Sequence, residues 1–142
     1  MTFYVGVDIA KYEHVASVLD STTGEFLVDS LHFDNNAKGF KLLLSNLSGL
    51  NKKDVVFGFE STAHYHQTLF SYLSGKKYRC FLINPFMTSR FRSISLRNAK
   101  NDNIDSHAIA SFLSFEYRNL IEEDFFLNEL KELSIQRDSL IW

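Results

Sequence analysis

The sequence contains few of the residues that break or cross-link a chain. Its 142 residues include one proline, six glycines and one cysteine. So little glycine and proline excludes collagen-like and low-complexity chains. The lone Cys80 excludes an internal disulfide framework and is typical of a reducing compartment, so we expect a cytoplasmic protein in which Cys80 is a small buried apolar side chain.

Two kinds of hydrophobic segment are also missing. No run of about 20 nearly uncharged apolar residues is present, as a transmembrane helix would require. The N-terminus lacks the basic start of a signal peptide and reaches Asp8 at once. We therefore expect no membrane partner.

Aromatic residues, by contrast, are abundant, with 14 Phe and 6 Tyr, and 45% of the chain is hydrophobic. This composition excludes intrinsic disorder, which requires few aromatics and a high net charge. The length matches a single domain, since most domains hold about 100–150 residues.

Charge is balanced overall, with a formal net charge of −2, but not along the chain. Residues 61–101 carry seven basic side chains and no acidic one, while the segments 1–60 and 106–142 are both net acidic. A cationic stretch of this kind indicates a polyanionic partner, although a solvated surface explains it as well. The pI near 6.2 weighs against tight DNA binding by this domain alone.

Hydrophobic patterning predicts five strands, over residues 3–9, 14–20, 25–33, 54–59 and 78–83. The first is apolar at nearly every position, which is typical of a central strand covered on both faces. Three consecutive strands predict an antiparallel meander, and the later ones alternate with helices. We therefore predict an α/β domain with a mixed five-stranded sheet and helices on both faces.

Four helices are predicted around this sheet. The first follows a cap at Asn35 or Asn36, the second covers residues 63–74 and the third follows Asn84-Pro85. The fourth covers residues 104–115. Two of them have a clear apolar face, made of Phe40, Leu43, Leu44 and Leu47 in the first and of Ile104, Ala108, Phe112 and Phe115 in the fourth.

The C-terminal segment predicts one more helix, over residues 126–142. Its Leu130, Leu133, Arg137 and Leu140 have the 3-4-3 spacing of a coiled-coil seam, which an ordinary amphipathic helix also shows over so short a length. We predict one folded domain over residues 1–120 and a C-terminal helix over 121–142. Because no stop signal precedes Trp142, we expect the chain to be a fragment.

Four carboxylates occupy informative positions. Asp8 lies inside the most apolar strand, where an unpaired charge is costly. Glu60 ends another apolar strand, and the carboxyl ends of strands are where α/β sheets bind ligands. Asp102 and Asp105 are three residues apart at a helix start, so both can project from one face.

Such a set predicts a site for Mg²⁺ or Mn²⁺, because these ions prefer carboxylate oxygens. No histidine belongs to the set, which disfavours zinc. Two ions about 3.5–4 Å apart would stabilise both the attacking and the leaving oxygen of a phosphodiester. Spacing alone does not show that the four carboxylates meet, and each one taken singly fits a surface or capping role.

The same residues match a known pattern in four blocks, covering residues 5–11, 60–65, 84–85 and 97–110. The last block, with Lys100, Asp102, Asp105 and Ala108, is the most specific. The chain resembles the N-terminal DEDD domain of IS110-type insertion-sequence transposases, which are relatives of the Piv-type DNA invertases. Asn101, Ser106 and Ala63 depart from residues common in the family, but every carboxylate is present.

The resemblance implies a RuvC-like, RNase H-type fold in which Asp8, Glu60, Asp102 and Asp105 form a catalytic tetrad that binds Mg²⁺. It implies DNA as substrate, a serine nucleophile supplied by a C-terminal domain that this chain lacks, and a homo-oligomer in the full-length protein. In some family members a bridge RNA guides target choice. On its own, the fragment is expected to bind metal but not to recombine DNA.

Five basic residues are candidates for contact with the nucleic-acid backbone. They are Lys11, Arg90, Arg92, Arg97 and Lys100. Phe86 and Phe91 lie among them, as core residues or as stacking platforms. His107, next to the acidic pair, is interpreted as structural or solvent-exposed.

Three other functions fit parts of the sequence. A stand-alone RuvC-like nuclease or resolvase would use metal-activated water in place of serine. Half of an actin-like or sugar-kinase ATPase shares the first strand pattern. It would need a second, glycine-rich loop to bind phosphate, and the six glycines of the chain make this unfavourable. A non-enzymatic module would use its last helix for dimerisation.

Overall fold

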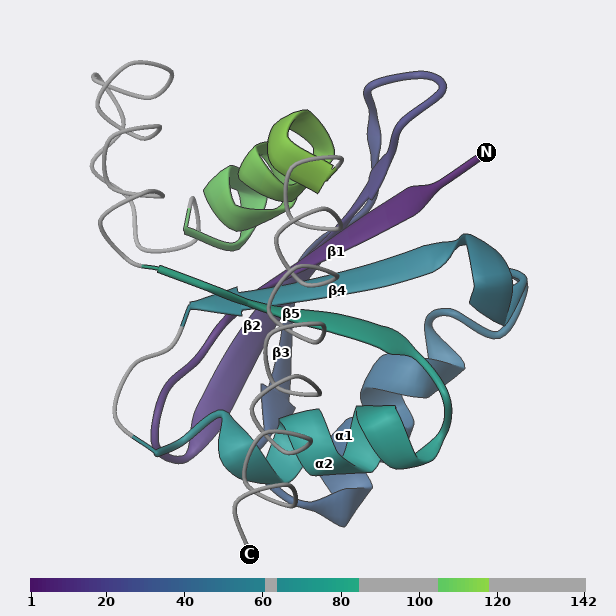
Figure 1. Cartoon of the computed structure of the whole chain (residues 1–142). Coiled ribbons are helices and arrows are strands. Elements are labelled where there is room, and N and C mark those ends of the chain that lie inside the picture. Colours follow the sequence, from purple (N-terminus) through teal and green to yellow (C-terminus); the bar gives the residue numbers. More distant parts are fainter. Residues whose placement is uncertain (61–63, 85–104, 118–142) are drawn as a thin grey trace, which may run out of the picture.

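A computed structural model describes residues 1–60, 64–84 and 105–117 (Figure 1). Its labelled elements are β1 (Phe3–Asp8), β2 (Glu13–Asp20), β3 (Phe26–Asp34), α1 (Ala37–Ser45), the 3-10 turn η1 (Lys52–Asp54), β4 (Val55–Glu60), α2 (Gln67–Gly75) and β5 (Arg79–Ile83). A further helix, green in Figure 1, covers residues 105–117. The helix expected after Pro85 and the segment 121–142 lie outside the described residues, so both stay predictions.

All five strands form one sheet in the order β3-β2-β1-β4-β5. β1 pairs antiparallel with β2, and β2 with β3, which confirms the predicted meander. β4 pairs parallel with both β1 and β5. The mixed sheet is therefore confirmed, and β1 lies at its centre.

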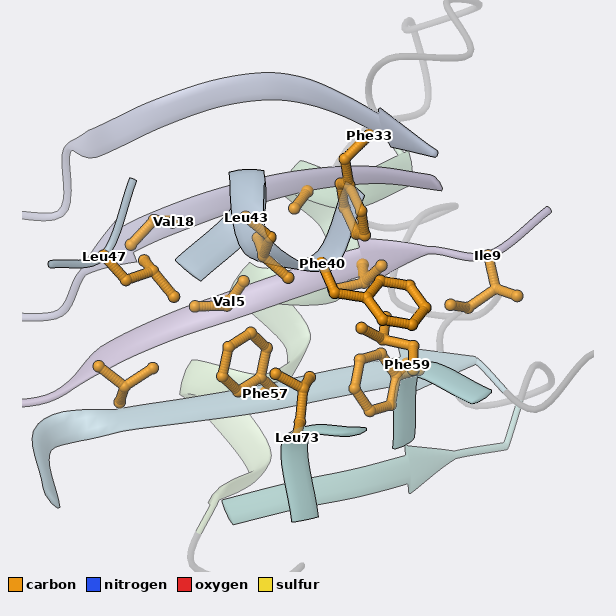
Figure 2. Close-up of a cluster of buried hydrophobic side chains, with 14 of the residues drawn as sticks. Val5, Ile9, Val18, Phe33, Phe40, Leu43, Leu47, Phe57, Phe59 and Leu73 are labelled. Carbon is orange, nitrogen blue, oxygen red and sulfur yellow. The ribbon is translucent and has the colours of Figure 1, made fainter. Parts of the chain in front are cut away.

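Each face of the sheet has its own hydrophobic core. Odd-numbered residues of β1, such as Val5, pack with Phe57 of β4 and with Phe40 and Leu43 of α1 (Figure 2). Even-numbered residues, such as Tyr4, pack on the other face with the helix over 105–117. Because side chains alternate along a strand, burial of both sets shows that β1 is covered on both sides, as its sequence predicts.

Three details of the helices differ from expectation or refine it. Asn36, rather than Asn35, caps α1, since its side chain accepts a hydrogen bond of 2.8 Å from the Gly39 N–H. α2 begins at Gln67, later than predicted. Ala108 and Phe112 are buried as predicted, but Phe115 is 76% exposed, so its assignment to the apolar face was wrong.

The error at Phe115 has a geometric cause. The stripe of the helix that contacts the sheet runs through Ser106, Ala110, Leu113 and Tyr117. Phe115 follows Ser106 by nine residues, which at about 100° per residue places it on the opposite side.

Gly6 brings this helix against the sheet at backbone distance. A Cβ atom at Gly6 would lie 2.3 Å from the Ala110 nitrogen and 2.3 Å from the Ser106 carbonyl oxygen. Both are backbone atoms, which cannot rotate away as a side chain can. The missing side chain is thus what allows the helix to lie directly on β1.

Substitution of Gly6 by alanine should force the helix away from the sheet. Overpacking of a core costs about 1–3 kcal/mol, and a contact with backbone belongs at the upper end of that range. We expect Gly6→Ala to lower the free energy of unfolding by about 3 kcal/mol in urea denaturation. Gly49→Ala is the matched control, because a Cβ there meets nothing within 4 Å. Equal stability of the two variants would contradict this packing.

Candidate metal centre at the carboxyl ends of β1 and β4

Asp8 and Glu60 are the last residues of two neighbouring parallel strands. The register pairs Val7 with Phe59, so Asp8 and Glu60 occupy the next paired position. Their backbones are therefore separated by about one strand spacing, which is about 5 Å. Asp8 was expected inside the core, but it ends β1 and is only half-buried. The strand end exposes it toward solvent, where a ligand can reach it.

Both carboxylates lie on the face that carries the helix over 105–117. Asp8 follows Gly6 by two residues, and Gly6 faces Ser106 and Ala110 of that helix. Glu60 follows Gly58 in the same way, and a Cβ at Gly58 would lie 3.0 Å from Leu113. Since alternate residues of a strand share a face, the two acids face the same side as these glycines.

Asp105 is the first described residue of this helix and lies toward the same end of the sheet. Ser106 contacts β1 at Gly6, while the ring of Tyr117, one helix length later, meets Tyr4 with centroids 5.6 Å apart. The helix therefore runs backward along β1, and its N-terminal end points toward the carboxyl end of β1. Three of the four predicted acids therefore lie toward the same end of the sheet, on the side that carries this helix.

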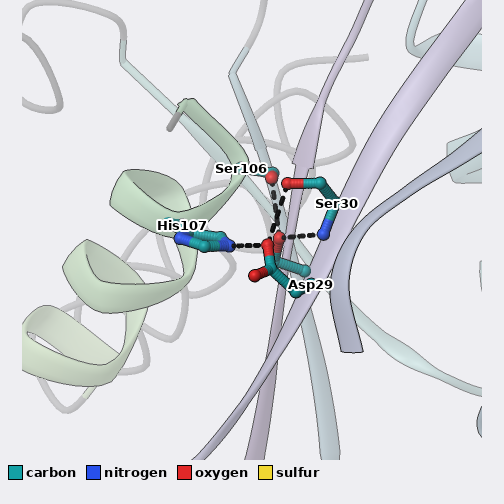
Figure 3. A network of polar contacts seen from close by, with 5 residues as sticks. Asp29, Ser30, Ser106 and His107 are labelled. Atoms are coloured by element: carbon teal, nitrogen blue, oxygen red, sulfur yellow. Dashed lines mark hydrogen bonds and ion pairs between the residues drawn. The ribbon is translucent and has the colours of Figure 1, made fainter. Parts of the chain in front are cut away.

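A polar network holds the start of the helix in place (Figure 3). The hydroxyls of Ser17 and the buried Ser106 lie 2.8 Å apart, and the Ser30 N–H donates to the Ser17 hydroxyl at 3.0 Å. His107 Nε2 lies 2.6 Å from Asp29 Oδ1. The network joins the helix to β2 and β3, so the position of Asp105 depends on residues in three elements.

Strand irregularity makes this network possible. The pairing of β2 with β3 shifts register between Ala16 and Val18, and Ser30 has a left-handed φ of 56°. The pKa of Asp29 is lowered, mainly by a hydrogen bond from the Ser30 hydroxyl and in second place by one from His107. The ring of His107 also stacks on Phe26, with centroids 4.1 Å apart. His107 is therefore structural, as interpreted from the sequence.

The loop that follows β1 lies directly beyond Asp8 and carries Lys11, which is exposed. Asn35 holds this loop in place through two hydrogen bonds. Its side-chain amide donates to the Lys11 carbonyl at 3.1 Å, and its backbone N–H donates to the Tyr12 carbonyl at 2.8 Å. Lys11 thus lies at the same end of the sheet as Asp8. Arg90, Arg92, Arg97 and Lys100 lie outside the described residues.

His14 supports the same loop from inside the fold. It is fully buried, and its Nδ1 accepts a hydrogen bond of 3.1 Å from the Ala10 N–H. A ring that accepts at Nδ1 carries its proton on Nε2 and is neutral. Burial lowers the pKa of His14 from its usual 6.5, and the Asn35 side chain opposes this in part.

The donor set suits a divalent cation, because it consists of carboxylate oxygens from Asp8, Glu60 and Asp105. Within residues 1–60, 64–84 and 105–117, however, no three acidic, histidine or cysteine side chains lie close enough to hold an ion. Asp102, the fourth predicted ligand, lies outside these residues. The chemistry of the site therefore fits a metal, while its complete geometry stays a prediction.

The sequence did not reveal the residues that support this site. Ser17, Asp29 and Asn35 are ordinary strand and turn residues, and nothing in their spacing links them to residue 105. The sequence held one hint for Asn35. Only one of Asn35 and Asn36 can cap the helix, so the asparagine that does not cap it is available for another contact. Cys80, which was expected to be buried, is only half-buried against the core, and this burial raises the pKa of its thiol to about 12.

The arrangement of the sheet and its helices defines a fold class, the RuvC-like fold of RNase H type. A structure of Thermus thermophilus RuvC in complex with Holliday junction substrate matches with a TM-score of 0.58 and 10% identity, covering 83% of this chain and 96% of that one. A second Thermus thermophilus RuvC structure matches with a TM-score of 0.53 and 10% identity, covering 82% and 96%. At such identity the likeness shows the fold.

The family is shown by the sequence itself. The model of the IS110-type DEDD transposases, described as "Transposase", matches residues 5–142. The chain therefore belongs to this family, and it is a transposase domain of a DNA-cleaving enzyme whose family uses divalent metal. No curated protein matches the sequence. None of the helices in the described ranges has the length and apolar character needed to cross a bilayer.

The buried neutral His14 should make stability depend on pH. Its pKa in the fold is lower than in the unfolded chain, so the unfolded chain binds the proton more readily. We expect this contribution to be complete above a pH of about 6.5 and to be lost as the pH falls below it. His14→Gln should flatten the decrease in the free energy of unfolding between about pH 7.5 and 5. The exposed His64→Gln should leave it unchanged, and an unaltered profile for His14→Gln would contradict the account.

Proposed function

We propose that Asp8, Glu60 and Asp105, together with Asp102, are the catalytic tetrad of this transposase domain and hold Mg²⁺, for which Mn²⁺ can substitute. The observation that carries the proposal is that the ends of β1 and β4 and the helical residue Asp105 lie toward one end of the sheet, on the same side of it. Carboxylates gathered in this way repel one another unless a cation lies between them.

The domain acts on DNA phosphodiester bonds during insertion-sequence transposition. A bound divalent ion would stabilise the negative charge that develops on the phosphate oxygens. The protein's own part is to orient the DNA. Lys11, at the same end of the sheet as Asp8, contacts the backbone, and Arg90, Arg92, Arg97 and Lys100 extend this contact.

The attacking group in this proposal is a serine from a second domain of the full-length transposase. We further propose that the full-length protein is a homo-oligomer that works in the cytoplasm, with a guide RNA as an additional partner. The resemblance to the family supports these points.

A second candidate function is a stand-alone nuclease for branched DNA, with metal-activated water as the nucleophile. The specific support is that this chain covers 96% of a RuvC chain whose structure contains a Holliday junction. The two candidates differ in what the 142-residue chain does alone. Cleavage of a four-way junction by the isolated chain with Mg²⁺ favours the nuclease, and cleavage only with the serine-bearing domain favours the transposase.

Neutral replacement of the tetrad should abolish catalysis. In a protein that joins this chain to the family's serine-bearing domain, we expect Asp8→Asn, Glu60→Gln and Asp105→Asn each to reduce DNA strand cleavage by at least about 100-fold, since a bound metal contributes several kcal/mol to the transition state. Cleavage of a labelled transposon end, resolved on a denaturing gel, measures this.

The matched control is Glu25→Gln, because Glu25 is exposed and follows the turn at the other end of the sheet. It should cleave like the parent protein. Full activity of Asp8→Asn would overturn the assignment, provided that the variant melts at the parent temperature.

A further inference from the structure

A basic pocket lies at the end of the sheet opposite the carboxylates. It has a volume of about 540 Å³ and is lined by Asn51, Lys52, Lys53, Lys77 and Arg79. Among the described residues, every ionisable member of this lining is basic. We call it the amino-end pocket, because its residues precede or begin β4 and β5, whose parallel pairing brings their amino ends together.

Two of its four cations are held in place by the fold. Lys52 Nζ donates to the Lys76 carbonyl at 2.7 Å and lies 5.0 Å from the centre of the Tyr78 ring. Arg79 donates from one guanidinium nitrogen to the Tyr117 hydroxyl at 2.6 Å, which uses one of its five N–H groups. Because these side chains are already ordered, binding an anion costs less conformational entropy.

A third cation occupies a backbone position that favours glycine. Lys77 has a left-handed φ of 70° in the turn after α2. There the Lys77 N–H donates to the Ser74 carbonyl, and the Tyr78 N–H donates to the Leu73 carbonyl. Helices commonly end in this way with glycine at the left-handed residue. Glycine would be the more stable residue in this backbone conformation, so the lysine at position 77 is not explained by backbone stability.

We propose that the amino-end pocket binds the phosphodiester backbone of a nucleic acid, at a contact separate from the catalytic carboxylates. This inference rests on the proposed function in taking nucleic acid as the polyanion. Cations contributed by two separate segments suit several successive phosphates better than one small anion.

The distance between the two ends of the sheet fits this role. β4 runs from Val55, next to the pocket, to Glu60, and its six residues span about 17–20 Å. A nucleic-acid strand rises about 3.4 Å per nucleotide, so five or six nucleotides cover that distance. One bound molecule therefore reaches both the pocket and the carboxylates.

The test removes two cations that hold no described contact of the fold. We would measure binding of the 142-residue chain to a fluorescent 20-base-pair DNA duplex and to an RNA duplex of equal length. The readout is anisotropy in EDTA at several salt concentrations. We expect Lys53→Gln/Lys77→Gly to bind at least about fivefold more weakly, with a salt slope reduced by about two. Loss with DNA only, or with RNA only, identifies the partner.

The control variant Lys41→Gln/Lys76→Gln removes the same charge from exposed lysines that do not line the pocket. Binding by this control should stay within twofold of the parent. Lys77→Gly alone should melt no lower than the parent, which separates lost binding from lost folding.

The proposal is overturned if the parent chain binds neither nucleic acid, if the pocket variant binds both as the parent does, or if the control loses as much affinity as the pocket variant. Because EDTA removes metal, this assay reports on the cations of the pocket and not on metal binding by the carboxylates. The pocket and the catalytic tetrad can therefore fail independently.

Discussion

The close approach of a helix to β1 at Gly6 is the contact on which the rest of this structure depends. A backbone nitrogen and a carbonyl oxygen of the helix over 105–117 occupy the space that any side chain at residue 6 would need. The helix can therefore lie directly against the strand that ends in Asp8, and Asp105 is brought toward that strand's carboxyl end. The serine network and the His107–Asp29 pair then hold the helix start in this position.

The sheet has a distinct chemical character at each end. Acidic residues gather at the carboxyl ends of β1 and β4, and lysine and arginine gather at the amino ends of β4 and β5. The hydrophobic cores on the two faces keep these ends about one strand length apart. In this arrangement one end is suited to hold metal and the other to hold the backbone of a nucleic acid, although the net charge is only −2.

Much of this architecture could be predicted because local rules determine it. The unbroken apolar run of β1 requires cover on both faces, and three strands joined by short turns pair as a meander. The acids at residues 8, 60 and 105 were identified from the same strand and helix patterns, with help from the family resemblance. Their placement toward one end of the sheet could not be derived from spacing, because it depends on a contact between residues 6 and 110.

Other features were missed for the same reason. Phe115 looked apolar on a helical wheel, but the helix rotates so that Ala110 meets Gly6, and this rotation leaves Phe115 exposed. Asp8 looked like a core residue because β1 was expected to continue through Ile9, whereas the strand ends at Asp8. The amino-end pocket joins two segments 24 or more residues apart, so no short motif marks it.

The most direct test of the central claim is a crystal structure of the chain in saturating Mn²⁺, with the metal located by its anomalous scattering. The account predicts a manganese peak bound by oxygens of Asp8 and Asp105, at about 2.0–2.3 Å, with Glu60 and Asp102 beside it. A well-ordered structure with no peak at these residues, or with the Asp8 and Asp105 carboxylates more than about 10 Å apart, far beyond two-metal spacing, would contradict it.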